Sequence, residues 1–121
     1  KNFDESIEML KSLSLRTGSV IAVTGVVDII TNGTHTYLIK NGCEVLSMVT
    51  GTGCMLTAII ASYISSGDIL EGTVLAIALM GICGELSQHV KGTGSFRTEL
   101  IDNIFSISDD IIIKKIRYEL K

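Results

Sequence analysis

The segment Val49–Cys54 reads Val-Thr-Gly-Thr-Gly-Cys and separates two parts of the sequence with different patterns. Short β-prone runs precede it, and a long apolar helical pattern that begins near Met55 follows it. The first amides of a helix have no partner within the helix, and the helix dipole favours negative charge at that end. Two glycines at a helix start bring such amides together, so the segment predicts a turn that can bind an anion.

The spacing excludes two familiar nucleotide-binding loops. The segment lacks the Gly-Lys-Ser/Thr ending of a Walker A loop. Leu56 stands where a dinucleotide-binding fingerprint needs its third glycine. A plain structural turn therefore stays open as an alternative to a turn that holds an oxyanion or a phosphoryl group.

The three cysteines divide into one candidate and two structural residues. Cys54 falls in the first turn of the predicted helix, where a thiol has a larger thiolate fraction and can act as a nucleophile or a base. Most free cysteines are instead small buried apolar side chains, and that alternative stays open for Cys54. We assign Cys43 and Cys83 to this structural class.

The composition favours a soluble cytoplasmic protein whose helices are buried on most sides. The hydrophobic fraction is 46% and the mean hydropathy is +0.47. The longest apolar run, residues 73–83, lies between Glu71 and Glu85, whereas a membrane span needs about 20 apolar residues. A net charge of −3 argues against a nucleic-acid partner, and three cysteines without metal-ligand spacing fit a reducing compartment.

The sequence pattern predicts a helix, a strand, a β-meander and then consecutive helices. The uniformly apolar strand predicted at residues 20–23 indicates a sheet covered on both faces. The charge-free helix predicted at residues 53–66 indicates burial on nearly every side. The other predicted helices are residues 2–16, 71–90 and 96–107, the meander strands are residues 26–31, 34–40 and 44–49, and residues 108–121 form a helix or a strand.

Several residues have two readings on sequence alone. Thr24 follows the predicted strand, so its hydroxyl either donates to a phosphate at the end of a parallel strand or closes a turn. Glu85 is either a solvated helix end or a buried partner, and Arg97 either reaches an anion or caps nearby carbonyls. Gly72, Gly81 and Gly84 lie within one predicted helix and suggest close helix–helix contact, because each lowers helix propensity.

Taken together, these motifs resemble the hydroxyethylthiazole kinases of the ribokinase-like superfamily. The matching elements are Val-Thr-Gly at residues 23–25, Asp28, the Asn-Gly pair at residues 32–33, Val-Thr-Gly-Thr-Gly-Cys, and Gly-Thr-Gly-Ser-Phe-Arg at residues 92–97. Relatives in the superfamily usually carry Asp where Cys54 stands. The resemblance implies a three-layer α/β fold with a central, mostly parallel sheet, of which residues 1–121 form the C-terminal part of a single kinase domain.

The resemblance also implies roles for individual residues. Gly51, Thr52 and Gly53 would form, with Cys54, the anion hole that receives the γ-phosphoryl group of ATP. Gly51 would also approach the thiazole, Cys54 would act as the base, and Thr24 would contact ATP. The implied reaction is Mg²⁺-dependent phosphorylation of the hydroxyl of 4-methyl-5-(2-hydroxyethyl)thiazole in thiamine salvage.

The family comparison further implies a homotrimer and an N-terminal half that is absent from this chain. The metal ligands are expected in that half, so the chain alone is expected to be inactive. Two positions depart from the family pattern: Val26 stands where Glu is common, and Thr93 stands where Pro is usual. The alternatives are another ribokinase-like enzyme (a pyrimidine or sugar kinase, or nicotinamide-nucleotide hydrate dehydratase), which would be expected to carry Asp at position 54, and a non-catalytic nucleotide-binding fragment.

Overall fold

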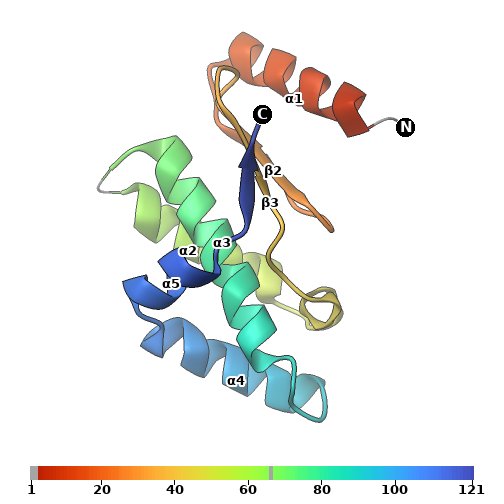
Figure 1. The fold of residues 1–121 in the computed structure, drawn as a ribbon, viewed down its shortest axis with the longest axis vertical. Coiled ribbons are helices and arrows are strands. Elements are labelled where there is room, and N and C mark those ends of the chain that lie inside the picture. The colour runs from red at the N-terminus through yellow and green to blue at the C-terminus, as the bar shows by residue number, and fades with distance from the viewer. Residues whose placement is uncertain (1–2, 66) are drawn as a thin grey trace.

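The computed structural model describes residues 3–65 and 67–121 (Figure 1). The predicted helix ends at Asn2 and Ser66 lie outside the described residues. The strands are β1 (Ile21–Val23), β2 (Asp28–Thr31), β3 (Thr36–Ile39) and β4 (Tyr118–Leu120). The helices are α1 (Phe3–Thr17), the 3₁₀ helix η1 (Glu44–Met48), α2 (Thr52–Ile64), α3 (Ile69–Ser87), α4 (Thr93–Ser106) and α5 (Asp109–Lys115).

The sheet lies between two layers of helices, and alternation along the strands sends side chains into both layers. Among the described strands the order is β1-β2-β3-β4, and each neighbouring pair is antiparallel. Ile29 and Leu38 pack with Ile7 of α1, whereas Ile30 and Ile39 face the α3 side. This gives the three layers expected of the α/β fold, although the parallel pairing predicted for the central sheet is not found among the described strands.

The hairpin between β2 and β3 turns at the Asn-Gly pair of residues 32–33. Asn32 Oδ1 accepts hydrogen bonds from the backbone N–H groups of Thr34 at 2.9 Å and His35 at 2.7 Å. Gly33 has φ +92°, a conformation that side-chain-bearing residues rarely adopt. A Cβ at Gly33 would also lie 2.6 Å from the Leu15 side chain, so α1 packs directly against the turn.

The prediction of a third meander strand over residues 44–49 is wrong. Residues 44–48 form the 3₁₀ helix η1, and the strand beside β3 is β4 from the C-terminus. Gly42 adopts φ +137° and turns the chain away from the sheet. The vacated edge of β3 is then occupied by β4, whose approach is fixed by a hydrogen bond from Arg117 N to Asn41 Oδ1 at 2.8 Å.

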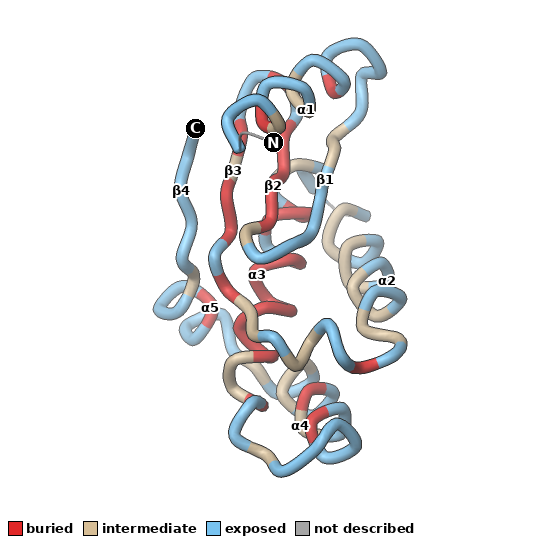
Figure 2. Tube along the Cα trace, turned by 90° about the vertical axis from the view of Figure 1, so that its right-hand side faces the viewer, coloured by how far each residue is buried: buried red, intermediate tan, exposed pale blue. Residues whose placement is uncertain are grey.

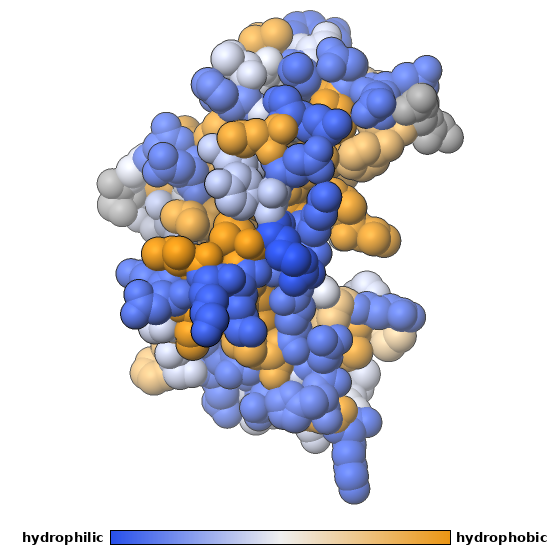
Figure 3. Space-filling view, viewed as in Figure 1, coloured by the Kyte–Doolittle hydropathy of each residue, from blue (hydrophilic) through white to orange (hydrophobic). Residues whose placement is uncertain are grey.

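Two elements predicted to be buried are open on one side. The residues of β1 are half-buried or exposed, and no residue of α2 is buried (Figure 2). Both predictions assumed cover on all sides, whereas in the described residues β1 is an edge strand and α2 packs mainly against α3. Hydrophobic groups consequently interrupt the polar surface of the molecule (Figure 3), and Val26 is 97% exposed.

Helix α3 is the central helix of the core. Asp68 caps its start by accepting a hydrogen bond from Glu71 N at 2.8 Å. Most of its residues are buried, and they contact both the sheet and α4. By length and composition alone, α3 is the one described helix that could cross a membrane, but 72% of its apolar window is buried inside this structure.

The glycines of α3 do make close contacts, two of them with helices and one with a loop. A Cβ at Gly72 would lie 3.0 Å from atoms of Tyr63 in α2. A Cβ at Gly81 would lie 2.7 Å from the Asn41 carbonyl oxygen, and one at Gly84 would lie 2.7 Å from the Leu46 side chain. The prediction of helix–helix contact therefore holds for Gly72 against α2 and for Gly84 against the 3₁₀ helix η1, whereas Gly81 lies against the loop after β3.

The C-terminal part of the chain shows where the helix after the second glycine loop begins and which secondary structure residues 108–121 adopt. Helix α4 begins at Thr93 rather than at residue 96, so most of the second glycine loop forms its first turn. Residues 108–121 contain both alternatives, since Ser108 caps α5 and the chain then enters β4. Ile112 of α5 closes the helical core by packing with Phe96 and Leu100 of α4.

Substitution of Gly81 by Ala should destabilise the protein by about 1–3 kcal/mol, because the added methyl group meets backbone atoms of Asn41 rather than a movable side chain. Gly94 is the matched control, because it also lies in a helix and a Cβ there would meet nothing within 4 Å. Gly94→Ala should be neutral or stabilising by up to about 1 kcal/mol. Thermal unfolding of both variants in the full-length gene product tests the contact, and equal melting temperatures would contradict it.

Candidate functional site

A cavity of about 840 Å³ lies where the ends of three segments meet the core helix. One wall is the turn after β1, residues 24–26, and another is residues 40–44 after β3. The start of α2 supplies Thr52 and Gly53, and Ile77 and Met80 of α3 form an apolar floor. The cavity therefore joins polar backbone and hydroxyl groups to a hydrophobic surface, an arrangement typical of small-molecule sites.

The turn into α2 has the geometry of an anion-binding helix start. Gly51 adopts φ +97°, which reserves the position for glycine, and its carbonyl accepts the first helical hydrogen bond from Met55 N at 3.0 Å. The Thr52 hydroxyl turns back and donates to the Leu46 carbonyl at 3.0 Å. The amides of residues 52–54 precede that first helical bond, so they are the free amides of the helix end.

Arg97 lies beside this turn. A Cβ built on Gly51 would come 3.7 Å from Arg97 Nη2, which places the guanidinium of α4 next to the start of α2. Of the two readings left open for Arg97, this position favours contact with an anion at the turn, because a positive charge there adds to the field of the helix end.

The structure brings some of the predicted site residues together and leaves others outside the cavity. Thr24, Thr52 and Gly53 line it together, although Thr24 and Thr52 are separated by most of the meander. Gly51 and Cys54 are not among the lining residues, and Cys54 is exposed in the first turn of α2.

The other two cysteines differ from each other. Cys83 is fully buried, and burial raises the pKa of its thiol to about 11, as expected of an inert structural cysteine. Cys43 is half-buried, packs against the core and also lines the cavity, so its assignment as a buried structural cysteine holds only in part. It is drawn to the cavity wall because Gly42 turns the chain out of the sheet one residue earlier.

Asp28 is a cavity residue for which the sequence analysis predicts no individual role. It is buried at the start of β2, lines the cavity, and accepts a hydrogen bond from Gly25 N at 2.9 Å. Burial raises the pKa of its carboxyl from 3.8 to about 6, and the Gly25 hydrogen bond opposes part of that rise. Asp28 thus holds the turn that carries Thr24. In the sequence, the one feature that could have indicated this role is that Asp28 is a single charged residue inside an apolar strand.

Glu85 is the buried partner and not the solvated helix end. Its carboxylate accepts a hydrogen bond from Gly42 N at 2.8 Å and forms an ion pair with Arg117 at 2.8 Å. These contacts fix the chain at the wall opposite Thr24.

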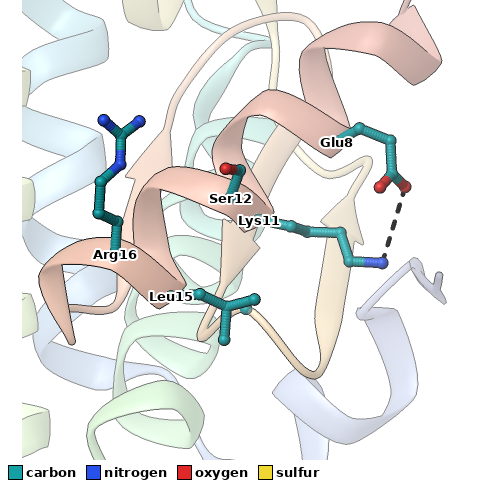
Figure 4. A pocket seen from close by; sticks show the side chains of 6 residues that line it. Glu8, Lys11, Ser12, Leu15 and Arg16 are labelled. Carbon is teal, nitrogen blue, oxygen red and sulfur yellow. Dashed lines mark ion pairs between the residues drawn. The ribbon is translucent and has the colours of Figure 1, made fainter.

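A second, shallow depression of about 530 Å³ is lined by residues of α1 and by Gly33 of the turn between β2 and β3 (Figure 4). Glu8 and Lys11, one helical turn apart on α1, form an ion pair at 3.7 Å among its lining residues, which also include Leu15 and Arg16. Of the residues predicted for the site, none belongs to this depression, so we assign it no functional role.

Comparison with known proteins decides the family. The family model described as "Hydroxyethylthiazole kinase family" matches residues 1–110. The chain belongs to the hydroxyethylthiazole kinase family. It is 85% identical to "Hydroxyethylthiazole kinase 2" of Clostridium botulinum (strain 657 / Type Ba4) over 97% of this chain and 44% of that protein. It is 42% identical to the hydroxyethylthiazole kinase of Clostridium acetobutylicum over 96% of this chain and 45% of that protein.

The solved structures agree with this assignment. The hydroxyethylthiazole kinase protein from Pyrococcus horikoshii OT3 superposes with a TM-score of 0.91 at 29% identity, covering 98% of this chain and 47% of that one. The chain thus spans less than half the length of the relatives it matches and corresponds to their C-terminal part.

The two departures from the pattern of the hydroxyethylthiazole kinases fall at defined positions. Thr93 is the first residue of α4, where proline is tolerated because its missing N–H would have no helical partner, so the exchange leaves the helix intact. Val26 is exposed at the cavity, where a glutamate would have brought negative charge.

Asp28→Asn should raise the melting temperature of the full-length gene product at neutral pH. An aspartate whose pKa is raised on folding favours the folded state when protonated, so the free energy of unfolding falls as the pH rises from about 4 through 6. The full shift corresponds to about 3 kcal/mol. Asparagine keeps the acceptor for Gly25 N and carries no charge. Thermal unfolding at about pH 5 and pH 7.5 should show a larger gain at the higher pH, and a pH-independent difference would contradict the buried carboxylate.

Proposed function

We propose that this chain is the phosphate-binding, C-terminal part of an ATP-dependent kinase that phosphorylates the hydroxyl of 4-methyl-5-(2-hydroxyethyl)thiazole. The observation that carries the proposal is the convergence of Thr24, Thr52 and Gly53 on one cavity at the free amide end of α2. The names of the relatives support the same activity.

The cavity fits a nucleotide in its chemistry. Leu56, Ile77 and Met80 offer an apolar surface for a base, and Thr24 and Gly53 lie at the polar side where phosphates would bind. ATP, when bound, supplies the phosphoryl group. Within the part of the chain that the structure describes, no group of three His, Cys, Asp or Glu side chains could hold a metal ion. We propose that an N-terminal half of the enzyme supplies the Mg²⁺ ligands.

The residues of the turn act by position and charge. Phosphoryl transfer requires alignment and charge stabilisation more than covalent chemistry. The amides of Thr52 and Gly53 stabilise negative charge that develops on the transferred group, and the Arg97 guanidinium adds positive charge beside Gly51. Gly51 approaches the thiazole, and Cys54, exposed at the same helix end, accepts the proton of the attacking hydroxyl.

The uncovered surfaces support a larger assembly. The exposed β1 edge and the apolar, unburied α2 suit cover by an N-terminal half of the same enzyme and by neighbouring subunits of a homotrimer. We propose that this assembly is cytoplasmic and acts in thiamine salvage, and that the 121-residue chain alone is inactive.

The direct test is a kinase assay on the full-length gene product with ATP and the thiazole alcohol. Turnover of this alcohol is the expected result. Absence of turnover, with phosphorylation of a hydroxymethylpyrimidine instead, would assign the protein to another ribokinase-like activity. The isolated chain serves as the second sample, and robust turnover by it would contradict the need for an N-terminal half.

Cys54→Ala should lower kcat by about 10²-fold or more and change ATP affinity much less, because the variant loses a proton acceptor and keeps the turn amides. Cys54→Asp should retain or increase turnover, since a carboxylate is also a base. Cys83→Ala is the matched thiol control, because that cysteine is buried within α3 and does not belong to the start of α2. It should lower stability and leave kcat/KM unchanged. Complete loss of turnover in Cys54→Asp would contradict the base role.

A further inference from the structure

The wall of the cavity opposite Thr24 is held by one carboxylate. Glu85 Oε2 accepts hydrogen bonds from Gly42 N at 2.8 Å and from Asn41 Nδ2 at 3.3 Å. Arg117 binds the same carboxylate at two points, with Nη2 2.8 Å from Oε2 and Nη1 3.4 Å from Oε1. Such paired Arg–carboxylate bonds fix geometry as well as charge.

Arg117 and Asn41 form further hydrogen bonds that hold residues 40–42 in place. Arg117 Nη2 donates to the Lys40 carbonyl at 2.9 Å, and Arg117 N donates to Asn41 Oδ1 at 2.8 Å. Asn41 is 4% exposed, and its Nδ2 also donates to the Lys115 carbonyl at 3.0 Å. The side-chain amide of Asn41 is therefore satisfied at both ends, as a buried polar network must be to stabilise a structure.

Helix α3 supplies both Gly81, against which the Asn41 backbone packs, and the carboxylate of Glu85. Gly81 and Glu85 lie one helical turn apart on the same face. Gly81 lets the Asn41 backbone approach the helix, and Glu85 then binds the amide of Gly42. Because Lys40, Asn41 and Gly42 all line the cavity, a change at Glu85 moves a wall of the site without touching a ligand.

We propose that Glu85, clamped by Arg117, is a positioning residue that fixes residues 40–42 as the wall of the nucleotide cavity. This inference deepens the proposed function and rests on it. It also gives the C-terminal strand a role, since Arg117 lies beyond the residues matched by the family model and immediately before β4.

The test compares Glu85→Gln and Arg117→Lys with the native full-length gene product. In Glu85→Gln an NH₂ group replaces one acceptor, and it faces the N–H groups of Gly42 or Arg117, which are also donors. Loss of one charge-assisted bond should raise KM and Kd for ATP about tenfold. The value of kcat and the KM for the thiazole alcohol should change less than about threefold, because the turn into α2 is untouched.

Arg117→Lys keeps the charge but loses the two-point bond, so it should shift KM and Kd for ATP in the same direction by a smaller factor. If Glu85→Gln does not yield folded protein, Arg117→Lys alone tests the positioning role. The matched control is Glu8→Gln, which removes the ion pair from Glu8 to Lys11 at 3.7 Å on α1, away from the cavity and from the Glu85 network. This control should leave KM and Kd for ATP unchanged.

The outcomes separate the two proposals. Unchanged ATP affinity in both variants, a fall in kcat alone, or an equal shift in Glu8→Gln would overturn the positioning role. If the native protein binds ATP but does not phosphorylate the thiazole alcohol, the proposed substrate fails while the Kd comparison still decides on Glu85. Failure of the native protein to bind ATP at all would overturn both.

Discussion

The close approach of α3 to the segment after β3 is the constraint on which the rest of the structure depends. A methyl group at Gly81 would collide with backbone atoms of Asn41, so the helix and that segment fit only because the side chain is absent. This contact places the sheet against one side of α3, while α4 and α5 pack against other parts of the same helix. Because α3 is buried along most of its length, any shift of Gly81 would be transmitted to several layers at once.

The elements that the sequence predicted correctly are those determined by local chemistry. The Asn32-Gly33 pair forms its turn through its own side chain and a positive φ, and the apolar run around residues 73–83 forms a buried helix. The errors concern partners that are remote in sequence. Residues 44–49 look β-prone, but the edge of β3 is taken by β4, about seventy residues later, and a local pattern carries no information about that competition.

The residues of the candidate site also divide into those that local motifs predict and those whose roles depend on remote contacts. Thr24, Thr52 and Gly53 belong to short motifs, and the structure places all of them on one cavity. The groups that shape the cavity were either given no role or left undecided: Asp28 binds the backbone of Gly25, and Glu85 meets an arginine 32 residues away. Their roles depend on burial and on tertiary contacts, whereas a motif records only residues that are adjacent along the chain.

The exposed apolar elements explain why the composition is so hydrophobic for a chain of this size. Helix α2 contains no charged residue, yet none of its residues is buried, and β1 offers an unpaired edge. Leaving such surface in water forfeits about 25 cal/mol for each Å² that could be covered, and a free strand edge invites pairing. Both elements flank the cavity, because β1 leads into the turn at Thr24 and the first residues of α2, Thr52 and Gly53, line it. A segment that covers β1 and α2 therefore also closes the sides of the cavity. The hydrophobic core and the site are completed by the same contacts.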